Sequence, residues 1–292
     1  MRGNADAHQL IAPGSLAAVL ELLADSPGEW TPIAGGTELM VAFASGKLGA
    51  RKLVSLWGIP ELRFIEIAPA SIAIGAGTTF LDLRAHSGLA AELPLIARSA
   101  SWIGSIANQG RATLGGNLVN GSPAADSSPA LLVYDAEIEM VSRRGRRRIP
   151  YAEFHLGYKR NALAADELLY AVHVPTRFAN HRQYFRKVGT RRAMAISKVA
   201  LAATALLQAD VIGEIRLAAA SLAPCPTRLY RTEAALLGQR VTKKSIQVAR
   251  RVLLAEAQPI DDIRSTAEYR RRVAVNLLEE FLLELSQEDT PR

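Results

Sequence analysis

Residues 111–126 read Arg-Ala-Thr-Leu-Gly-Gly-Asn-Leu-Val-Asn-Gly-Ser-Pro-Ala-Ala-Asp, and a second glycine pair lies in Ala34-Gly35-Gly36-Thr37-Glu38. Glycine has no Cβ, so consecutive glycines let backbone N–H groups approach a ligand closely and point in one direction, which forms a concave anion site. One such pair alone is more typical of an ordinary turn between a strand and a helix. Two pairs together indicate a cradle for a diphosphate. Neither pair matches the G-x-G-x-x-G or G-x-x-x-x-G-K-[ST] pattern of the Rossmann and P-loop folds.

The first 176 residues alternate between short helices and strands around these two glycine pairs. Ser15 precedes apolar residues at helical spacing, which predicts a helix over 15–23 with Ser15 as its N-cap. Thr37 is expected to cap a second helix, and Thr78 or Thr79 a third. The pattern further predicts strands over 30–33, 137–141 and 168–174, a hairpin over 64–79 with its turn at 68–70, and helices over 81–86, 95–106 and 129–133.

The stretch from Pro175 to Arg182 combines turn formers and charge without apolar periodicity, which predicts a domain boundary. We therefore expect one domain over 1–176 and a smaller one over 181–288. The second domain reads as three strands, over 183–188, 198–207 and 212–220, followed by helices that Thr232, Thr242 and Thr266 precede. Strands and helices are segregated without regular βαβ alternation, so the fold class is expected to be α+β.

The composition limits the cofactor sites and the location that we expect for this chain. The 292 residues contain a single cysteine, Cys225, which cannot supply the several thiolates of an iron–sulfur cluster and is expected to be a plain structural thiol. No histidine spacing indicates a metal site. No apolar run is long enough to span a membrane, and the N-terminus does not resemble a secretory signal, so a cytoplasmic location is expected.

Basic residues give the chain a net charge of +7. They gather in Arg143-Arg144-Gly145-Arg146-Arg147-Arg148, which we expect at the solvated tip of a β-hairpin. Such a tip could instead hold an acidic partner or nucleic acid. Nucleic acid is not expected to be a partner, because no zinc motif, RNA-binding signature or helix-turn-helix pattern accompanies the charge.

Both glycine segments resemble the two FAD-binding signatures of the flavoprotein subunits of molybdenum hydroxylases, the family of xanthine dehydrogenase, carbon monoxide dehydrogenase and aldehyde oxidoreductase. The resemblance lies in residues 34–40 and 111–126, and residues 185–197 resemble the start of that family's C-terminal domain. Two departures are Asn108-Gln109-Gly110, where the family has Ile-Arg-Asn, and Ala195, where it has an acid. The resemblance implies a PCMH-type FAD-binding domain of two α/β subdomains, followed by a smaller C-terminal domain with a three-stranded antiparallel sheet plus helices.

The resemblance also implies the contacts of non-covalently bound FAD. From the residues alone, Asp126 could be a loop cap and Lys187 a surface lysine on a strand. Beside a flavin, Lys187 would favour the anionic reduced form. The implied contacts are Ile33, Ala34, Gly35, Gly36, Thr37 and Glu38 on one side of the diphosphate, Ala112, Thr113, Gly115, Gly116 and Asn117 on the other, Asp126 at the sugar hydroxyls, Ile103 over the adenine or flavin end, and Leu169 and Lys187 near the isoalloxazine.

As a member of this family, the chain would take electrons from iron–sulfur clusters on a partner and pass them through FAD to a final acceptor. The implied partners are a molybdopterin-binding large subunit and a small subunit with two [2Fe-2S] clusters, assembled as a dimer of heterotrimers. No catalytic residue and no metal ligand is expected in this chain, because the cofactor carries the redox chemistry. The alternatives are a stand-alone FAD oxidoreductase of related fold and a basic non-enzymatic binding module.

Overall fold

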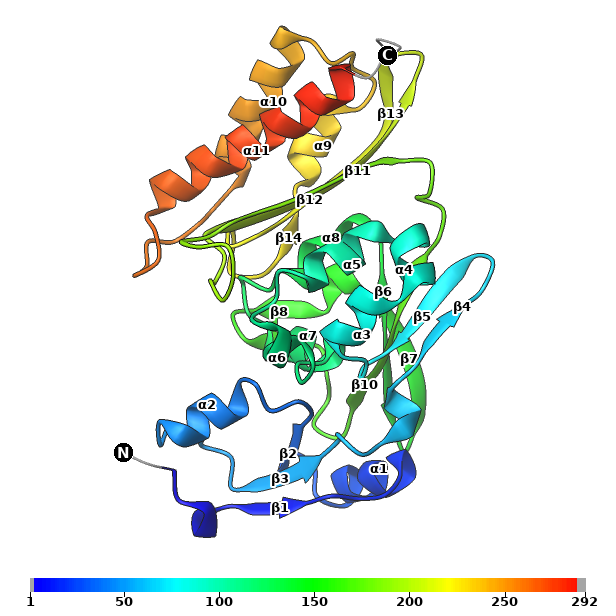
Figure 1. The fold of residues 1–292 in the computed structure, drawn as a ribbon, viewed down its shortest axis with the longest axis vertical. Coiled ribbons are helices and arrows are strands. Elements are labelled where there is room, and N and C mark those ends of the chain that lie inside the picture. The colour runs from blue at the N-terminus through cyan, green and yellow to red at the C-terminus, as the bar shows by residue number, and fades with distance from the viewer. Residues whose placement is uncertain (1–2, 288–292) are drawn as a thin grey trace.

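The computed structural model describes residues 3–287, and it is an α+β fold of three stacked parts (Figure 1). A small parallel sheet lies at the bottom, an antiparallel sheet with short helices lies in the middle, and a second antiparallel sheet with long helices lies at the top. This arrangement confirms the predicted fold class. Residues 1, 2 and 288 of the predicted domain ranges lie outside the described residues.

The bottom part is a three-stranded parallel sheet in the order β1-β3-β2. The predicted first helix is confirmed, because the Ser15 hydroxyl accepts a hydrogen bond from the N–H of Ala18 and opens α1. The predicted strand over 30–33 is β2, whereas β1 and β3 were not predicted. The elements are η1 (Ala5–Ala7), β1 (Gln9–Ile11), α1 (Leu16–Asp25), β2 (Trp30–Ile33), α2 (Leu39–Ala44), β3 (Lys52–Ser55) and η2 (Pro60–Leu62).

The middle part is a five-stranded antiparallel sheet in the order β4-β5-β10-β6-β7, and short helices cover one of its faces (Figure 1). The hairpin predicted over 64–79 is confirmed as β4 and β5. The elements are β4 (Ile65–Ile67), β5 (Ser71–Gly75), α3 (Phe80–Ala85), α4 (Ser87–Glu92), α5 (Pro94–Ala100), α6 (Ile106–Gln109), α7 (Leu114–Asn120), α8 (Ser127–Val133), β6 (Glu137–Ser142), β7 (Gly145–Pro150), η3 (Tyr151–Glu153), β8 (His155–Gly157), β9 (Arg160–Asn161) and β10 (Leu168–Pro175).

Two helix predictions in this part had different outcomes. Thr79, one of the two predicted candidates, is the N-cap of α3, and it forms a reciprocal capping box with Asp82 that was not predicted. The helix predicted over 95–106 is confirmed as α5 up to Ala100 but is too long, because a turn follows there. Gly104 in that turn has a φ of 53°, a left-handed conformation that ends the helical path.

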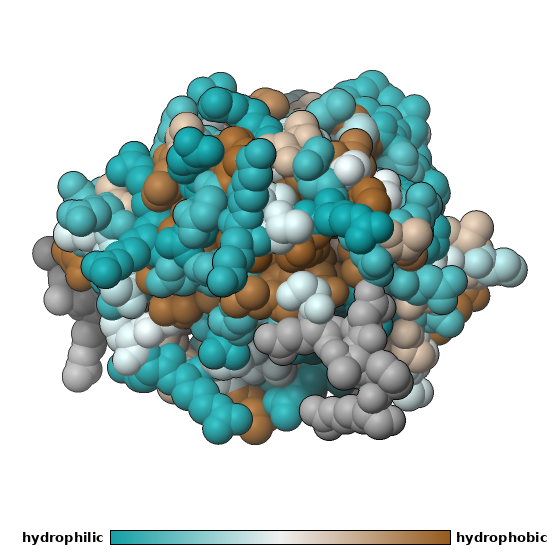
Figure 2. All heavy atoms as spheres, turned by 90° about the horizontal axis from the view of Figure 1, so that it is seen from above, coloured by the Kyte–Doolittle hydropathy of each residue, from teal (hydrophilic) through white to brown (hydrophobic). Residues whose placement is uncertain are grey.

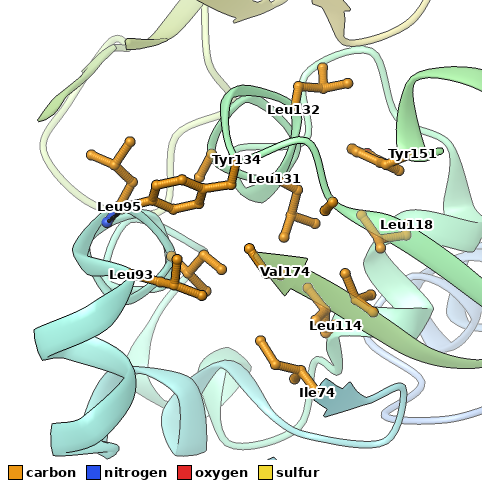
Figure 3. Packing of buried hydrophobic residues seen from close by; sticks show 14 of the residues in the cluster. Ile74, Leu93, Leu95, Leu114, Leu118, Leu131, Leu132, Tyr134, Tyr151 and Val174 are labelled. Atoms are coloured by element: carbon orange, nitrogen blue, oxygen red, sulfur yellow. Dashed lines mark hydrogen bonds between the residues drawn. The ribbon is translucent and has the colours of Figure 1, made fainter. Parts of the chain in front are cut away.

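The core of the middle part lies between the sheet and its helices (Figure 3). Fully buried side chains from α7, α8 and the strands point toward one another there, including Leu114, Leu131 and Val174. The same hydrophobic cluster continues into the top part through Phe185, Ala202 and Ala218. The two larger parts are therefore joined by a shared apolar core.

The arginine-rich segment forms a hairpin as predicted, with β7 antiparallel to β6. Its arginines are exposed, as expected at a hairpin tip, but each also pairs with an acid. Arg146 and Arg148 each lie 3.1 Å from a carboxylate oxygen of the buried Glu139, and Arg147 lies 2.6 Å from Glu167. These acids neutralise much of the local positive charge, which weakens the reading of the segment as a basic binding surface.

The top part is an antiparallel sheet in the order β11-β12-β13-β14, with α9, α10 and α11 packed on one face (Figure 1). The three predicted strands are confirmed, and a two-residue strand, β14, extends the sheet. Seen from above, this part presents mainly hydrophilic residues, with hydrophobic ones gathered between them (Figure 2). The elements are β11 (Arg182–Val188), β12 (Val199–Gln208), β13 (Val211–Ala220), β14 (Thr227–Arg228), α9 (Tyr230–Leu236), α10 (Lys243–Glu256) and α11 (Ala267–Gln287).

The predicted helix starts of the top part differ in outcome. Thr242 caps α10 through a capping box with Ser245, and the Thr266 hydroxyl accepts a hydrogen bond from the N–H of Tyr269 in α11. Thr232, by contrast, lies inside α9. Its buried hydroxyl donates to Glu256 at 2.7 Å, so it ties α9 to α10 rather than opening a helix.

Cys225 is partly buried, and burial raises the pKa of its thiol. A raised thiol pKa lowers the fraction of reactive thiolate, in keeping with a structural thiol. Over residues 3–287, no cluster of three or more His, Cys, Asp or Glu side chains could hold a metal ion. No helix in the described chain is both long enough and apolar enough to cross a membrane.

Candidate functional site

A cavity of about 850 Å³ lies between the three parts and is lined by residues from each. Its size is within the range typical of cofactor sites. Ile33, although predicted as a contact, lies outside the lining, and its side chain packs behind Gly36. The predicted residues in the lining are Ala34, Gly35, Gly36, Thr37, Glu38, Ile103, Ala112, Thr113, Gly115, Gly116, Asn117, Asp126, Leu169 and Lys187.

The two glycine loops lie directly against each other in the wall of this cavity. A Cβ built on Gly35 would lie 1.6 Å from the carbonyl oxygen of Arg111, so only glycine fits at this contact. A Cβ on Gly116 would lie 3.9 Å from the Cβ of Ala34. The expected convergence of the two loops is therefore present in the fold.

The first loop, residues 34–38, offers unused backbone donors. The N–H groups of Gly35, Gly36 and Thr37 donate to no other group within residues 3–287. Gly36 has a φ of 75°, which inserts a left-handed turn between β2 and α2. The prediction that Thr37 caps α2 is wrong for this reason: the helix starts later, with Glu38 at the N-cap position and no side-chain cap. Adjacent N–H groups without a partner are suited to an anion.

The second loop differs from the first. Thr113 caps helix α7, which was not predicted, and the N–H groups of both glycines already donate within the chain. The N–H of Gly116 donates to the Thr113 hydroxyl at 3.1 Å, and the N–H of Gly115 donates to the carbonyl of Ala76 at 2.9 Å. A Cβ on Gly115 would lie 2.6 Å from the Cβ of Ala76. The expectation that this pair also presents N–H groups to an anion is therefore wrong, and Gly115 serves the close packing of α7 on the chain after β5.

A buried ion pair lies at another wall of the cavity. The ammonium of Lys187 on β11 lies 2.5 Å from Asp126 Oδ2 and also donates to the carbonyl of Trp102 at 3.0 Å. The hydroxyl of Ser197 donates to the other carboxylate oxygen of Asp126. Burial raises the pKa of the Asp126 carboxyl, and the charge of Lys187 and both hydrogen bonds act in the opposite direction.

These contacts correct two readings of the sequence. Lys187 is 8% exposed, so it is not a surface lysine. Asp126 occupies the N-cap position of α8, but its side chain makes no capping hydrogen bond there, so it is not a loop cap. Both side chains are instead held to each other across the boundary between the middle and top parts.

Other polar groups of the lining are also oriented by partners. Glu38 lies 3.2 Å from Lys159, and the side-chain oxygen of Asn117 accepts a hydrogen bond from Ser127 at 2.7 Å. Sequence reasoning missed Lys159, which sits in no recognisable motif. It also missed Ser197, which is the last residue of the segment that resembles the family. Further lining residues that were not predicted include Gly104, Val119, Asn161, Met194, Ile196 and Arg264.

Comparison with known proteins extends these observations over almost the whole chain. Residues 6–177 match the family described as FAD binding domain in molybdopterin dehydrogenase, and residues 183–285 match the CO dehydrogenase flavoprotein C-terminal domain. The chain is 32% identical to the xanthine dehydrogenase FAD-binding subunit of Escherichia coli O157:H7, over 92% of this chain and 93% of that one. It is 27% identical to the carbon monoxide dehydrogenase medium chain of Hydrogenophaga pseudoflava, over 93% and 94%.

Solved structures agree with these matches. A carbon monoxide dehydrogenase chain from Hydrogenophaga pseudoflava superposes with a TM-score of 0.89 at 27% identity, over 94% of this chain and 95% of that chain. A chain of reconstituted CO dehydrogenase from Oligotropha carboxidovorans superposes with a TM-score of 0.90 at 25% identity, over 96% of both chains. The chain therefore belongs to the family of the FAD-binding domain of molybdopterin dehydrogenases, with the C-terminal domain of the CO dehydrogenase flavoproteins.

Proposed function

We propose that this chain is the FAD-binding electron-transfer subunit of a molybdenum hydroxylase complex. It takes electrons from iron–sulfur clusters on a partner subunit and passes them through FAD to a final acceptor. One observation carries the proposal: two glycine loops, distant in sequence, touch at the wall of one large cavity, and the first loop offers free N–H donors there. FAD supplies the redox chemistry when it is bound, and the chain supplies binding, orientation and electrostatics.

Each wall of the cavity has its own role in this proposal. The N–H groups of Gly35, Gly36 and Thr37 bind the diphosphate, and Gly116 leaves room for it opposite Ala34. Among the predicted contacts of the second loop, Thr113 has an N–H that donates to no other group within residues 3–287, and the others act through shape and side chains. Asp126 and Lys187 form the charged wall, where Asp126 binds the sugar hydroxyls of the cofactor and Lys187 lies near its isoalloxazine. The side chain of Ile33 supports the first loop from behind, so we omit it from the direct contacts.

Partner subunits complete the function. The single cysteine of this chain cannot hold an iron–sulfur cluster, so we place the clusters and the molybdopterin on a small and a large partner subunit. A dimer of such heterotrimers is the proposed assembly. We also propose that the chain divides into a FAD-binding domain over 1–176 and a C-terminal domain over 181–288. The cytoplasmic location stays a prediction.

The proposed site is tested by Gly116→Val and Asp126→Ala in the full-length chain. We expect both variants to lower FAD occupancy, measured as flavin absorbance per protein after purification and after titration with FAD. The Cβ of valine would lie 2.9 Å from the Thr113 hydroxyl and 3.9 Å from the Cβ of Ala34, and alanine removes the partner of Lys187. Gly49→Val is the matched control, because a Cβ at Gly49 meets nothing within 4 Å. Unchanged flavin content in both site variants would reject the site.

A further inference from the structure

Helix α8 belongs in sequence to the first domain but is packed into the sheet of the second. All seven of its residues are buried, and it contacts β12, β13 and β14. Its apolar side chains share one hydrophobic cluster with Phe185, Ala202 and Ala218 of that sheet. Figure 1 shows α8 directly against these strands, below the C-terminal domain. The position of α8 is therefore coupled to the docking of the two domains.

An acidic residue at each end of α8 pairs with cations from the second domain or the linker. At the start, Asp126 binds Lys187, as described above. Just past the end, Asp135 lies 2.7 Å from Arg228 of β14, 2.8 Å from Arg216 of β13 and 2.7 Å from Arg177 of the linker. The helix is thus held at both ends by ion pairs that cross the domain boundary.

The ion pairs of Asp135 form a clamp between the C-terminal end of α8 and the second domain. This clamp depends on the negative charge of Asp135. The side chains of Arg228 and Arg216 are only 9% and 14% exposed, whereas that of Asp135 is 37% exposed. Arg228 also donates to the carbonyl of Leu132 at the end of α8. Arg228 also pairs with Glu233, and Arg216 and Arg177 also pair with Glu214. Removing the Asp135 carboxylate would therefore leave these arginines to share two acids instead of three, and weakening a buried pair in this way costs more than losing an exposed one.

We propose that Asp135 is a positioning residue for the FAD site: through α8 it fixes the C-terminal sheet so that Lys187 meets Asp126 in the cavity wall. Asp135 does not line the cavity, so it acts only through the docking of the domains. The cavity itself depends on that docking, because Asp126 comes from the first domain and Lys187, Met194 and Arg264 come from the second. This inference rests on the proposed FAD site.

The test is Asp135→Asn in the full-length chain, with the dissociation constant for FAD as the readout. Asn keeps the size of Asp and tolerates the left-handed φ of 51° found at this position, so the variant removes the charge alone. The matched control is Asp210→Asn, since Asp210 also has a left-handed φ, 66°, and lies 3.6 Å from Arg240 but at an exposed turn away from the cavity. We expect Asp135→Asn to weaken FAD binding about tenfold and the control to leave it unchanged.

A double-variant cycle separates positioning from a general loss of stability. If Asp135 acts by placing Lys187, its substitution should have little further effect in a Lys187→Gln background, so the two effects on FAD affinity should be far from additive. Additive effects would overturn the inference. Should Asp135→Asn fail to fold, Arg177→Gln removes a single, half-exposed arm of the clamp, and a folded Arg177→Gln variant with wild-type FAD affinity would overturn the inference.

The failure of this inference differs from the failure of the proposed function. A wild-type chain that binds no FAD would reject the proposed function and this inference with it. An Asp135→Asn variant that binds FAD as tightly as a wild-type chain that does bind it would reject only the role of Asp135.

Discussion

Gly35→Ala is the smallest change that should separate the two glycine loops. The added Cβ would start 1.6 Å from the carbonyl oxygen of Arg111, whereas ordinary van der Waals contact begins at 3.4 Å. The loops must therefore move apart by about 1.8 Å, and neither is the far end of a flexible side chain that could turn away. Such overpacking costs about 1–3 kcal/mol of folding stability. We also expect FAD binding to weaken by at least about tenfold, because a displacement of about 1 Å already disturbs a preorganised site strongly.

Titration of the purified chain with FAD, followed by flavin fluorescence, measures the affinity, and thermal unfolding measures the stability. Gly49→Ala is the control, since the same added atom meets nothing within 4 Å there. Gly115→Ala isolates the other clash, that of α7 with Ala76, and tests whether packing of the second loop alone disturbs binding. Wild-type affinity and stability in Gly35→Ala would refute the contact between the loops on which the site depends.

Two further outcomes follow from the scaffold. Thr79→Ala removes the capping box of α3 and should lower the free energy of unfolding by about 1 kcal/mol, measured by urea denaturation; no loss would contradict the cap. Burial alone would raise the pKa of Glu139, but hydrogen bonds from His173 and Arg146 and the charge of Arg148 hold that pKa below its ordinary value. Its contribution to stability is therefore present above about pH 4.3, the usual value for Glu, and is lost as pH falls through the lower pKa of the folded state. The stability difference between wild type and Glu139→Gln should shrink below about pH 4, and a difference independent of pH from 7 to 3 would exclude this role.

Elements that are determined by residues close together in the sequence could be predicted from it. Ser15, Thr79 and Thr242 cap helices in the structure because a hydroxyl placed just before an apolar period satisfies an N–H three residues later. The strands predicted over 198–207 and 212–220 are joined by a tight turn in which Ala209 and Asp210 both adopt left-handed conformations. Thr232 has the same residue type without the same position, because its hydroxyl serves a neighbouring helix.

Elements that depend on distant partners could not be read in this way. Strand β1 has three residues and β3 has four, and each exists because it pairs in parallel with a strand far away in sequence. Strand β14 has only two residues and is defined by its pairing with β13. The helix predicted over 95–106 was too long for a different reason, since its apolar period continues past Ala100, where the helix ends, into the turn that contains Gly104.

The candidate site shows the same division. Motif reading placed nearly all the predicted contacts on one cavity, because glycine pairs and their neighbours are local features. It did not show that Lys187 and Asp126 bind each other, or that Ser197 completes the arrangement, since these residues come from different domains. Charged residues of opposite sign can be listed from a sequence, but their pairing is set by how the domains dock.

The two glycine pairs have similar sequences but different roles in the structure. In the first, Gly36 turns left-handed and leaves successive N–H groups free beside the cavity, so the absence of a side chain serves a ligand. In the second, Gly115 lets α7 approach Ala76, and the N–H groups are already bonded within the chain. A substitution at Gly35 should therefore change FAD binding and folding stability together through the contact with Arg111, and one at Gly115 should do so through the packing of α7. The two pairs differ in the atoms that each glycine contacts, and these contacts cannot be read from the sequence.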